Sequence, residues 1–201
     1  MARQYTEAEL RDITRQYLAK GANRQLIRDL AQSWQHRDHG PRRYHKAYED
    51  DSLTLWVLGW RPGIDTIDHH VDVTPIHGHG ASDVLVTCLE GEVDDDYYGE
   101  IDQTLAVGES APCLFVPRRL ISGNSLFIPK NGVHVMRCDE KEGRGFGLTL
   151  HAYSPRLRTM TYYDVADGLP WRPDVPGRLR LVDTWTDTDT DQYVPSTEVA
   201  A

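Results

Sequence analysis

Two histidine motifs have the residue types and the spacing of a metal site. His77 and His79 belong to the segment TPIHGH at 74–79, and His134 ends the segment FIPKNGVH at 127–134. Side chains two residues apart on a β-strand point to the same face, so His77 and His79 can bind one ion from a single strand. A third imidazole from a distant strand would complete a facial set of neutral nitrogens and leave positions for a substrate and O₂, which suits non-haem iron. The pattern therefore predicts a metal site, provided that His134 reaches the other two.

The region that contains these histidines has the composition of a β-sheet protein. From Tyr44 onward, short runs of β-branched and aromatic residues alternate with Gly, Pro, Asn and Asp, which is typical of strands joined by turns. A series of strands without helices between them predicts a sandwich or a barrel. The expected strands are at residues 54–60, 71–77, 84–89, 92–97, 110–116, 125–128, 133–137, 145–153 and 160–165.

Residues 1–43 are predicted to form helices that cap this β-region. Thr6 followed by Glu9 is a capping box. Apolar residues then recur at helical spacing, and Gly21 stands where it could end the first helix. A second helix is expected at about 23–34, followed by a polar connector. The predicted organisation is a helical segment at 1–43, a metal-binding β-domain at 44–186 and an acidic, mobile tail at 187–201.

Composition limits the classes of partner and the location. The 201 residues are enough for one well-packed domain, and 22 basic against 31 acidic side chains give a net charge of −9. This charge argues against binding to nucleic acid or to anionic membranes. The sequence shows no long apolar run, no signal-peptide core at its N-terminus and no CxxC pair among its three cysteines. These features predict a soluble, cytoplasmic protein with reduced thiols, and we expect a monomer or a small homo-oligomer.

The acidic stretches and the cysteines have ordinary structural explanations. Residues 94–96 are three consecutive aspartates, and aspartates alternate with threonines in 183–191. We expect both stretches on solvated loops. Cys88 lies in an apolar strand and is expected to pack in the core, and Cys113 and Cys138 are expected to be structural as well.

The motifs taken together resemble those of the cupin superfamily and, within it, the cysteine dioxygenase (thiol dioxygenase) family. The histidine pair is followed by Gly91 and then by Gly123-x5-Pro129-x4-His134, as in the two cupin motifs. The local matches to thiol dioxygenases are WRPG at 60–63, TPIHGH at 74–79, NGVH at 131–134 and LHAYSP at 150–155. The resemblance covers residues 44–163, which is over half of the chain.

This resemblance implies a jelly-roll-like cupin β-barrel that holds Fe(II), with another divalent first-row metal such as Ni as the alternative. The implied ligands are His77, His79 and His134. It also implies that O₂ is the co-substrate and that a small thiol, such as cysteine or a cysteine-like compound, is oxidised to a sulfinate. The implied catalytic relay consists of Thr149, His151 and Tyr153. Because these three alternate along one strand, they share a face, and a hydroxyl that orients an imidazole can in turn orient a phenol.

Three features depart from the family pattern. Val84 stands where animal members carry a cysteine that is cross-linked to the tyrosine, so we expect Tyr153 to be uncrosslinked. Tyr44 and Lys46 occupy the Tyr-x-Arg positions that bind the substrate carboxylate in the family, which makes them the candidate substrate-binding residues. Lysine is a point charge and cannot form the two parallel hydrogen bonds of a guanidinium, so we expect an altered substrate. About eight extra residues, which include Asp65, Asp68, His69 and His70, precede the metal strand and could form a lid.

Several alternatives remain open from the sequence. Asp83 follows His79 by four residues, where many cupins have a glutamate ligand, so it is a candidate fourth ligand. The same site could belong to a specialised biosynthetic oxygenase that makes a product other than a simple sulfinate. It could also belong to a non-catalytic cupin that only binds a metal. The relay argues against the last alternative, because a binding site has little need for an oriented phenol.

Overall fold

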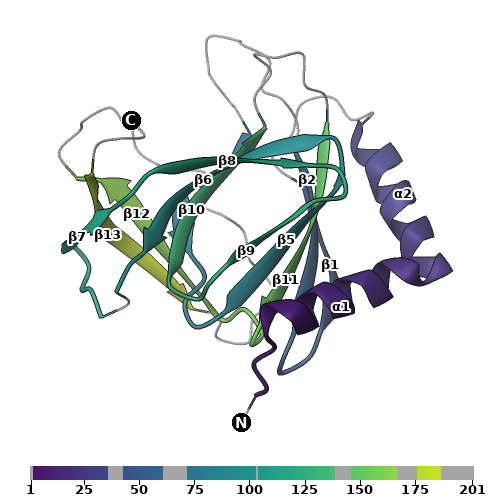
Figure 1. The fold of residues 1–201 in the computed structure, drawn as a ribbon, viewed down its shortest axis with the longest axis horizontal. Helices are drawn as coiled ribbons and strands as arrows, with labels where there is room; N and C mark the ends of the chain where they lie inside the picture. Colours follow the sequence, from purple (N-terminus) through teal and green to yellow (C-terminus); the bar gives the residue numbers. More distant parts are fainter. Residues whose placement is uncertain are drawn as a thin grey trace.

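The structure is a computed structural model that describes residues 2–35, 43–60, 72–102, 104–138, 146–166 and 176–186. In this part of the chain, two helices precede a series of strands that form two antiparallel sheets (Figure 1). No helix among the described residues is long and apolar enough to span a membrane. The predicted insertion with Asp65, Asp68, His69 and His70 and the predicted tail at 187–201 lie outside the described residues.

The first sheet has the strand order β1-β2-β11-β5-β9. Its strands are β1 (Arg43–Glu49), β2 (Thr54–Trp60), β5 (Asp83–Glu90), β9 (Ser125–Ile128) and β11 (Gly147–Ser154). The second sheet has the order β7-β13-β12-β4-β10-β6-β8, and β3 pairs with β10 beside this path. Its strands are β3 (Asp72–Val73), β4 (Ile76–Gly78), β6 (Glu92–Glu100), β7 (Ser110–Cys113), β8 (Val116–Ile121), β10 (Gly132–Cys138), β12 (Thr159–Val165) and β13 (Gly177–Thr186).

The two sheets pack face to face around a shared core. Val84 and Trp60 from the first sheet lie in one apolar cluster with Val93, Leu120 and Met136 from the second. Neighbouring strands such as β2 and β11 are far apart in the sequence, which is the connectivity of a jelly roll rather than of a simple meander. The prediction of an all-β, jelly-roll-like fold with an N-terminal helical cap is therefore confirmed.

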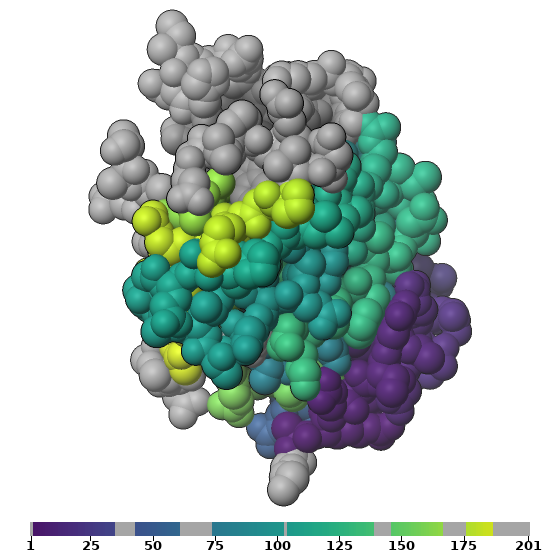
Figure 2. All heavy atoms as spheres, turned by 60° about the vertical axis from the view of Figure 1, so that its left-hand side comes forward, coloured from purple at the N-terminus to yellow at the C-terminus, as the bar shows by residue number. Residues whose placement is uncertain are grey.

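The two helices cover the outer face of the first sheet. Helices α1 (Glu7–Ala19) and α2 (Gly21–Gln35) form a separate layer against the strands, seen in purple in Figure 2. Leu10 is fully buried there against Leu148 and Leu150 of β11. The capping box of Thr6 is present. The prediction that Gly21 ends the first helix was wrong, because Lys20 is the C-cap and α2 begins one residue later.

The acidic stretch at 94–96 was wrongly predicted to be a solvated loop. These three aspartates lie inside β6, where alternation turns Asp95 toward the space between the sheets. Asp95 and Asp96 are both buried. Asp183, likewise expected on a loop, lies in β13, and the rest of that stretch beyond residue 186 is outside the described residues. The sequence-based analysis missed the arginines that pair with these carboxylates: Arg118 and Arg119 of β8 pair with Asp95 and Asp94, and Arg137 of β10 pairs with Asp96.

Two predicted strands also differ in their bounds. The segment 71–77 forms two short strands, β3 and β4, with an interruption at Thr74 and Pro75 because proline cannot donate to a strand ladder. The segment 110–116 is split between β7 and β8, and β8 continues to Ile121. Polar and charged residues of β8 concealed this strand from a reading based on apolar runs.

Candidate metal centre

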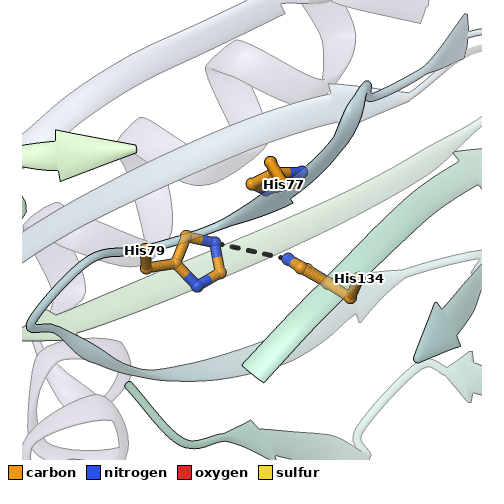
Figure 3. A group of neighbouring side chains, drawn as sticks. All are labelled: His77, His79 and His134. Carbon is orange, nitrogen blue, oxygen red and sulfur yellow. Dashed lines mark hydrogen bonds between the residues drawn. The ribbon is translucent and has the colours of Figure 1, made fainter. Parts of the chain in front are cut away.

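Two neighbouring strands of the second sheet bring the three histidines together. His77 lies on β4 directly opposite His134 on β10, and His79 follows β4 on the same face as His77 (Figure 3). All three side chains are buried, and their candidate ligand atoms lie within 4.8 Å of one another. The Nε2 atoms of His79 and His134 are 3.3 Å apart. The condition on which the sequence-based prediction depended, that the three imidazoles meet, is fulfilled.

The spacing of His79 and His134 matches that of two ligands of one metal ion. Two nitrogens that each bind one ion at about 2.1 Å are separated by roughly 3.0–3.4 Å, depending on the angle at the metal, and the observed 3.3 Å falls in this range. Burial, followed by the effects of neighbouring His134 and His77, holds the pKa of His79 well below its usual value. A neutral imidazole keeps the lone pair that a metal needs. The cluster could therefore hold a metal.

The Nδ1 atoms of the three histidines have different surroundings. Nδ1 of His77 donates to the carbonyl oxygen of Pro75 at 2.8 Å, which leaves the lone pair on Nε2. Nδ1 of His134 lies 2.5 Å from Oδ1 of Asp95. Nδ1 of His79 is buried and has no hydrogen-bond partner among the described residues. His134 is therefore supported by an anionic group.

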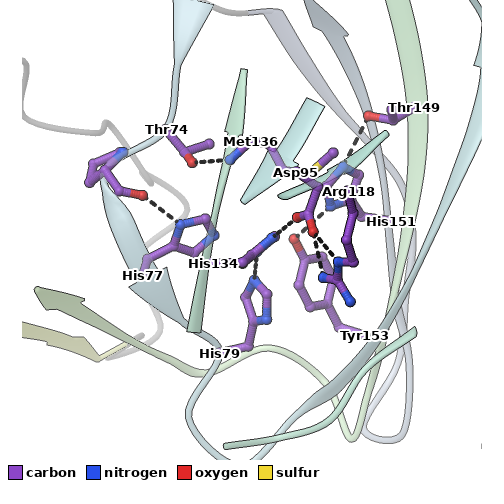
Figure 4. A network of polar contacts seen from close by, with 11 residues as sticks. Thr74, His77, His79, Asp95, Arg118, His134, Met136, Thr149, His151 and Tyr153 are labelled. Atoms are coloured by element: carbon purple, nitrogen blue, oxygen red, sulfur yellow. Dashed lines mark hydrogen bonds and ion pairs between the residues drawn. The ribbon is translucent and has the colours of Figure 1, made fainter. Parts of the chain in front are cut away.

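Asp95 and Arg118 extend this support away from the metal site, and the sequence-based analysis missed both. They lie directly opposite each other on β6 and β8, and Nε of Arg118 donates to Oδ2 of Asp95 at 2.7 Å. Although burial opposes ionisation of Asp95, interactions with His134 and Arg118 outweigh this effect and lower its pKa. Figure 4 shows the resulting line from Arg118 through Asp95 to His134.

The proposed relay forms a continuous hydrogen-bonded chain on β11. Thr149 Oγ1 is 3.0 Å from Nε2 of His151, and Nδ1 of His151 is 3.2 Å from the hydroxyl of Tyr153 (Figure 4). Trp60 adds a fourth member, because its indole Nε1 donates to Thr149 Oγ1 at 2.7 Å. The Tyr153 ring lies edge-on to His79, with centroids 5.2 Å apart. The chain therefore ends beside the histidine cluster.

Trp60 allows one consistent direction for the hydrogen bonds along this chain. An indole N–H can only donate, so Thr149 accepts from Trp60 and can donate its own proton to Nε2 of His151. In that arrangement Nδ1 of His151 carries the other proton and donates to the oxygen of Tyr153. The phenol proton of Tyr153 then points away from His151. The role of Trp60 was not identified from the sequence, although the residue begins the WRPG segment.

Val84 and Asp83 are neighbours on β5, and their side chains lie on opposite faces of the strand. Val84 lies directly opposite Tyr153, so the cross-link position is adjacent to the phenol but lacks sulfur. Asp83 lies on the other face, toward the helical cap. Its Oδ2 accepts from Gln4 at 2.6 Å and its Oδ1 from the backbone N–H of Lys130 at 2.8 Å. The possibility that Asp83 is a fourth metal ligand is therefore contradicted, because alternation along β5 turns its side chain away from the histidines.

Lys46 shares the inner face of the first sheet with the relay. It lies opposite Trp56 on β2, and Trp56 lies opposite His151 on β11. The ammonium of Lys46 is 5.5 Å from the Trp56 ring centroid and 3.1 Å from a carboxylate oxygen of Glu49. Tyr44 packs edge-on against the same tryptophan at 5.6 Å. Both candidate substrate-binding residues, Tyr44 and Lys46, therefore lie on β1, the edge strand of the first sheet. They are on the same face of this sheet as Tyr153.

A second cation near this edge was not predicted. Nε of Arg156 lies 3.5 Å from Glu49, so Glu49 stands between Arg156 and Lys46. Glu49 pairs with Thr54, which in turn pairs with Tyr153. The ion pairs are therefore at the Tyr153 end of the sheet. Arg156 directly follows the LHAYSP segment, which is the signal that could have identified it.

Comparison with known proteins gives limited similarity. No protein-family model matches this chain, and no curated protein matches it in sequence. A solved oxalate oxidase structure is 13% identical over 55% of this chain and 45% of its own chain, with a TM-score of 0.40. An RmlC-like cupin family protein with a double-stranded β-helix fold from Methanocaldococcus jannaschii is 14% identical over 59% of this chain and 84% of its own, with a TM-score of 0.40.

A cupin superfamily protein from Desulfitobacterium hafniense is 13% identical over 61% of this chain and 84% of its own, also with a TM-score of 0.40. The chain thus spans less than half the length of the oxalate oxidase that it matches. Similarity of this degree carries no argument about activity. The functional argument therefore depends on the residues of the site.

Proposed function

We propose that this protein is a non-haem, iron-dependent dioxygenase that converts a small thiol into a sulfinate. The observation that carries the proposal is a buried group of three imidazoles beside an oriented phenol, with centroids of His79 and Tyr153 5.2 Å apart. The sequence resemblance to thiol dioxygenases supports the choice of chemistry. A site built only to bind a metal has no use for the hydrogen-bonded chain from Trp60 to Tyr153.

His77, His79 and His134 would hold the metal. When bound, Fe(II) supplies Lewis acidity toward a thiol and electrons for the activation of O₂. No carboxylate joins this ligand group among the described residues. The three imidazoles would then be the protein ligands among the described residues, and the metal would supply further coordination positions to the substrate.

The chain itself orients the reactants and excludes water. His134 is fully buried, and apolar side chains such as Val84 and Val86 line the same inner core. If Nδ1 of His151 is the donor, Tyr153 accepts this hydrogen bond and keeps its own proton for the site. This proton can stabilise negative charge that develops on oxygen or sulfur during the reaction.

The proposed reaction balances without an external reductant. The thiol sulfur loses four electrons and O₂ gains four: the O–O bond breaks, and both oxygen atoms form bonds to sulfur. The thiol S–H bond breaks, and its proton is released to water because the sulfinate product is ionised at neutral pH. One O₂ is consumed for each thiol.

Lys46 and Tyr44 are proposed to bind the end of the substrate that carries its acidic group. Lys46 is partly exposed, with 34% of its side chain accessible, and lies on the same face as the relay. Its ammonium offers a single point charge and cannot form two parallel hydrogen bonds. A flexible acidic substrate such as cysteine or a cysteine-like thiol therefore fits better than one that requires two parallel hydrogen bonds.

Oxygen consumption by the iron-loaded protein tests the proposal. A panel of cysteine, 3-mercaptopropionate and cysteamine is supplied, and uptake is compared with product mass. We expect one thiol to be consumed with one O₂ and to gain two oxygen atoms. His134→Gln should abolish this activity. His45→Gln should retain it, because His45 pairs with Val57 on β1 and β2, outside the cluster.

Two results would contradict the proposal. The first is an iron-loaded protein that consumes no O₂ with any thiol of the panel. The second is a product that has lost CO₂ or has rearranged nitrogen, which would indicate a specialised biosynthetic oxygenase that uses the same ligands.

A further inference from the structure

We infer that Asp95, held by Arg118, is a positioning residue that gives one proposed metal ligand, His134, an anionic hydrogen-bond partner and so strengthens it as a donor. The inference rests on the proposed metal site but not on the thiol chemistry. A bound metal would then have no carboxylate ligand among the described residues. A carboxylate would instead be hydrogen-bonded to one of its histidine ligands.

The contact between Asp95 and His134 is buried and short. Both residues are fully excluded from solvent, and Oδ1 lies 2.5 Å from Nδ1. Strands β6 and β10 are direct neighbours, and both side chains point into the space between the sheets. A carboxylate can only accept here, so the His134 proton is held on Nδ1 and the lone pair on Nε2.

Arg118 holds the opposite side of the same carboxylate. Its Nε donates to Oδ2 at 2.7 Å, and Nη2 forms an ion pair with the same oxygen. The guanidinium carbon lies 4.3 Å from the centroid of the Tyr97 ring. Since a guanidinium is planar and its rotation is restricted by this stacking, Asp95 is held in one rotamer. Each Asp95 oxygen therefore has a separate partner.

The three proposed ligands differ in the group that contacts their Nδ1 atoms. His77 donates to the neutral carbonyl of Pro75, and Nδ1 of His79 has no partner among the described residues. A carboxylate acceptor raises the basicity of an imidazole more than a carbonyl does. We therefore expect His134 to contribute more to metal affinity through its partner than His77 does.

The neighbouring aspartates of β6 provide an internal comparison. Asp96 is buried like Asp95, but alternation places it on the other face of the sheet, where it pairs with Arg137. If Asp95 served only as a buried ion pair that stabilises the sheet, removal of either carboxylate charge would have a similar effect. A role at the metal predicts that only Asp95 matters for metal binding.

The test is the affinity of folded apo protein for Co²⁺ and Ni²⁺, measured by competition with a chelator. We expect Asp95→Asn to weaken binding about 10- to 100-fold, and we expect Asp96→Asn to change it less than about threefold. The Co²⁺ absorption spectrum should change for Asp95→Asn only. Far-UV circular dichroism checks that each variant is folded.

Arg118→Lys is the second variant, in case Asp95→Asn does not fold. This variant retains the positive charge but loses the planar guanidinium that contacts Asp95 through two nitrogens. We expect a smaller but measurable loss of metal affinity. Equal affinities for wild type, Asp95→Asn and Arg118→Lys would overturn the inference, as would equal losses in the Asp95 and Asp96 variants. A wild-type protein that binds neither ion would overturn the metal site itself. Metal binding that depends on Asp95, in a protein inactive toward thiols, would support the inference and reject only the proposed reaction.

Discussion

At the scale of single residues, the position of Tyr153 depends on contacts from three directions. His151 holds its hydroxyl, His79 lies against its ring, and Val84 occupies the place directly opposite on β5. A valine at this place cannot form a covalent bond to the ring. The orientation of the phenol therefore depends on the hydrogen bond to His151 and on packing.

Replacement of Tyr153 by phenylalanine tests this residue directly. The ring keeps its packing and loses only the hydroxyl, so we expect unchanged Co²⁺ affinity and a turnover lower by on the order of 10². Tyr163→Phe is the matched control, because Tyr163 is buried in a different apolar cluster. Steady-state O₂ uptake and metal titration provide the two measurements. Loss of metal affinity in Tyr153→Phe would instead assign the phenol a structural role.

At the scale of secondary-structure elements, the position of β10 determines whether the three histidines come together. This strand pairs with β4 on one side and β6 on the other, so it brings His134 against both His77 and Asp95. Gly132 begins the strand where its neighbours are very close. A Cβ there would lie 2.6 Å from Ile128 Cγ2 and 2.9 Å from the carbonyl oxygen of Pro129.

Gly132→Ala should therefore displace the beginning of β10. We expect a loss of about 1–3 kcal/mol in the free energy of unfolding, which is typical of overpacking, together with weaker Co²⁺ binding. Gly21→Ala is the control, because a Cβ at that position meets no atom within 4 Å. Urea unfolding and metal titration of both variants check the prediction. Wild-type behaviour of Gly132→Ala would show that the turn adjusts without moving His134.

At the scale of the whole molecule, packing of the sheets determines the state of the chain's own thiols. Cys88, Cys113 and Cys138 are all buried. Burial raises the pKa of Cys88 and Cys113 from 9.0 to about 11. The thiols of Cys88 and Cys113 are therefore protonated at neutral pH, and no cysteine belongs to the histidine cluster among the described residues. A thiol substrate would not compete with these groups.

These raised pKa values predict a loss of stability at alkaline pH. Between pH 9 and 11, Cys88 is ionised in the unfolded chain but remains protonated in the folded chain. The free energy of unfolding therefore keeps its full value below pH 9 and decreases as the pH rises above 9. Two pKa units correspond to about 2–3 kcal/mol at pH 11. Urea unfolding between pH 8 and 11 measures this slope, which Cys88→Ala should reduce. An unchanged slope in Cys88→Ala would contradict the prediction.

Much of the site follows from local periodicity and could be predicted. The alternation of a strand places His77 with His79, and Thr149 with His151 and Tyr153, whatever the rest of the fold does. The capping box of Thr6 is equally local. The β-branched and aromatic composition after residue 44 was enough to predict an all-β domain. Each of these predictions needs only neighbours within a few residues.

Contacts between distant strands could not be obtained in this way. The pairing of His134 with His77, the inward position of Asp95 and the outward position of Asp83 all depend on which strands are neighbours and in which register. A shift of one residue turns every side chain of a strand to the opposite face. The amino-acid sequence alone thus determined the donor types and their local spacing. Only the tertiary structure decided which carboxylate contacts the histidine cluster, because register is set by packing across both sheets.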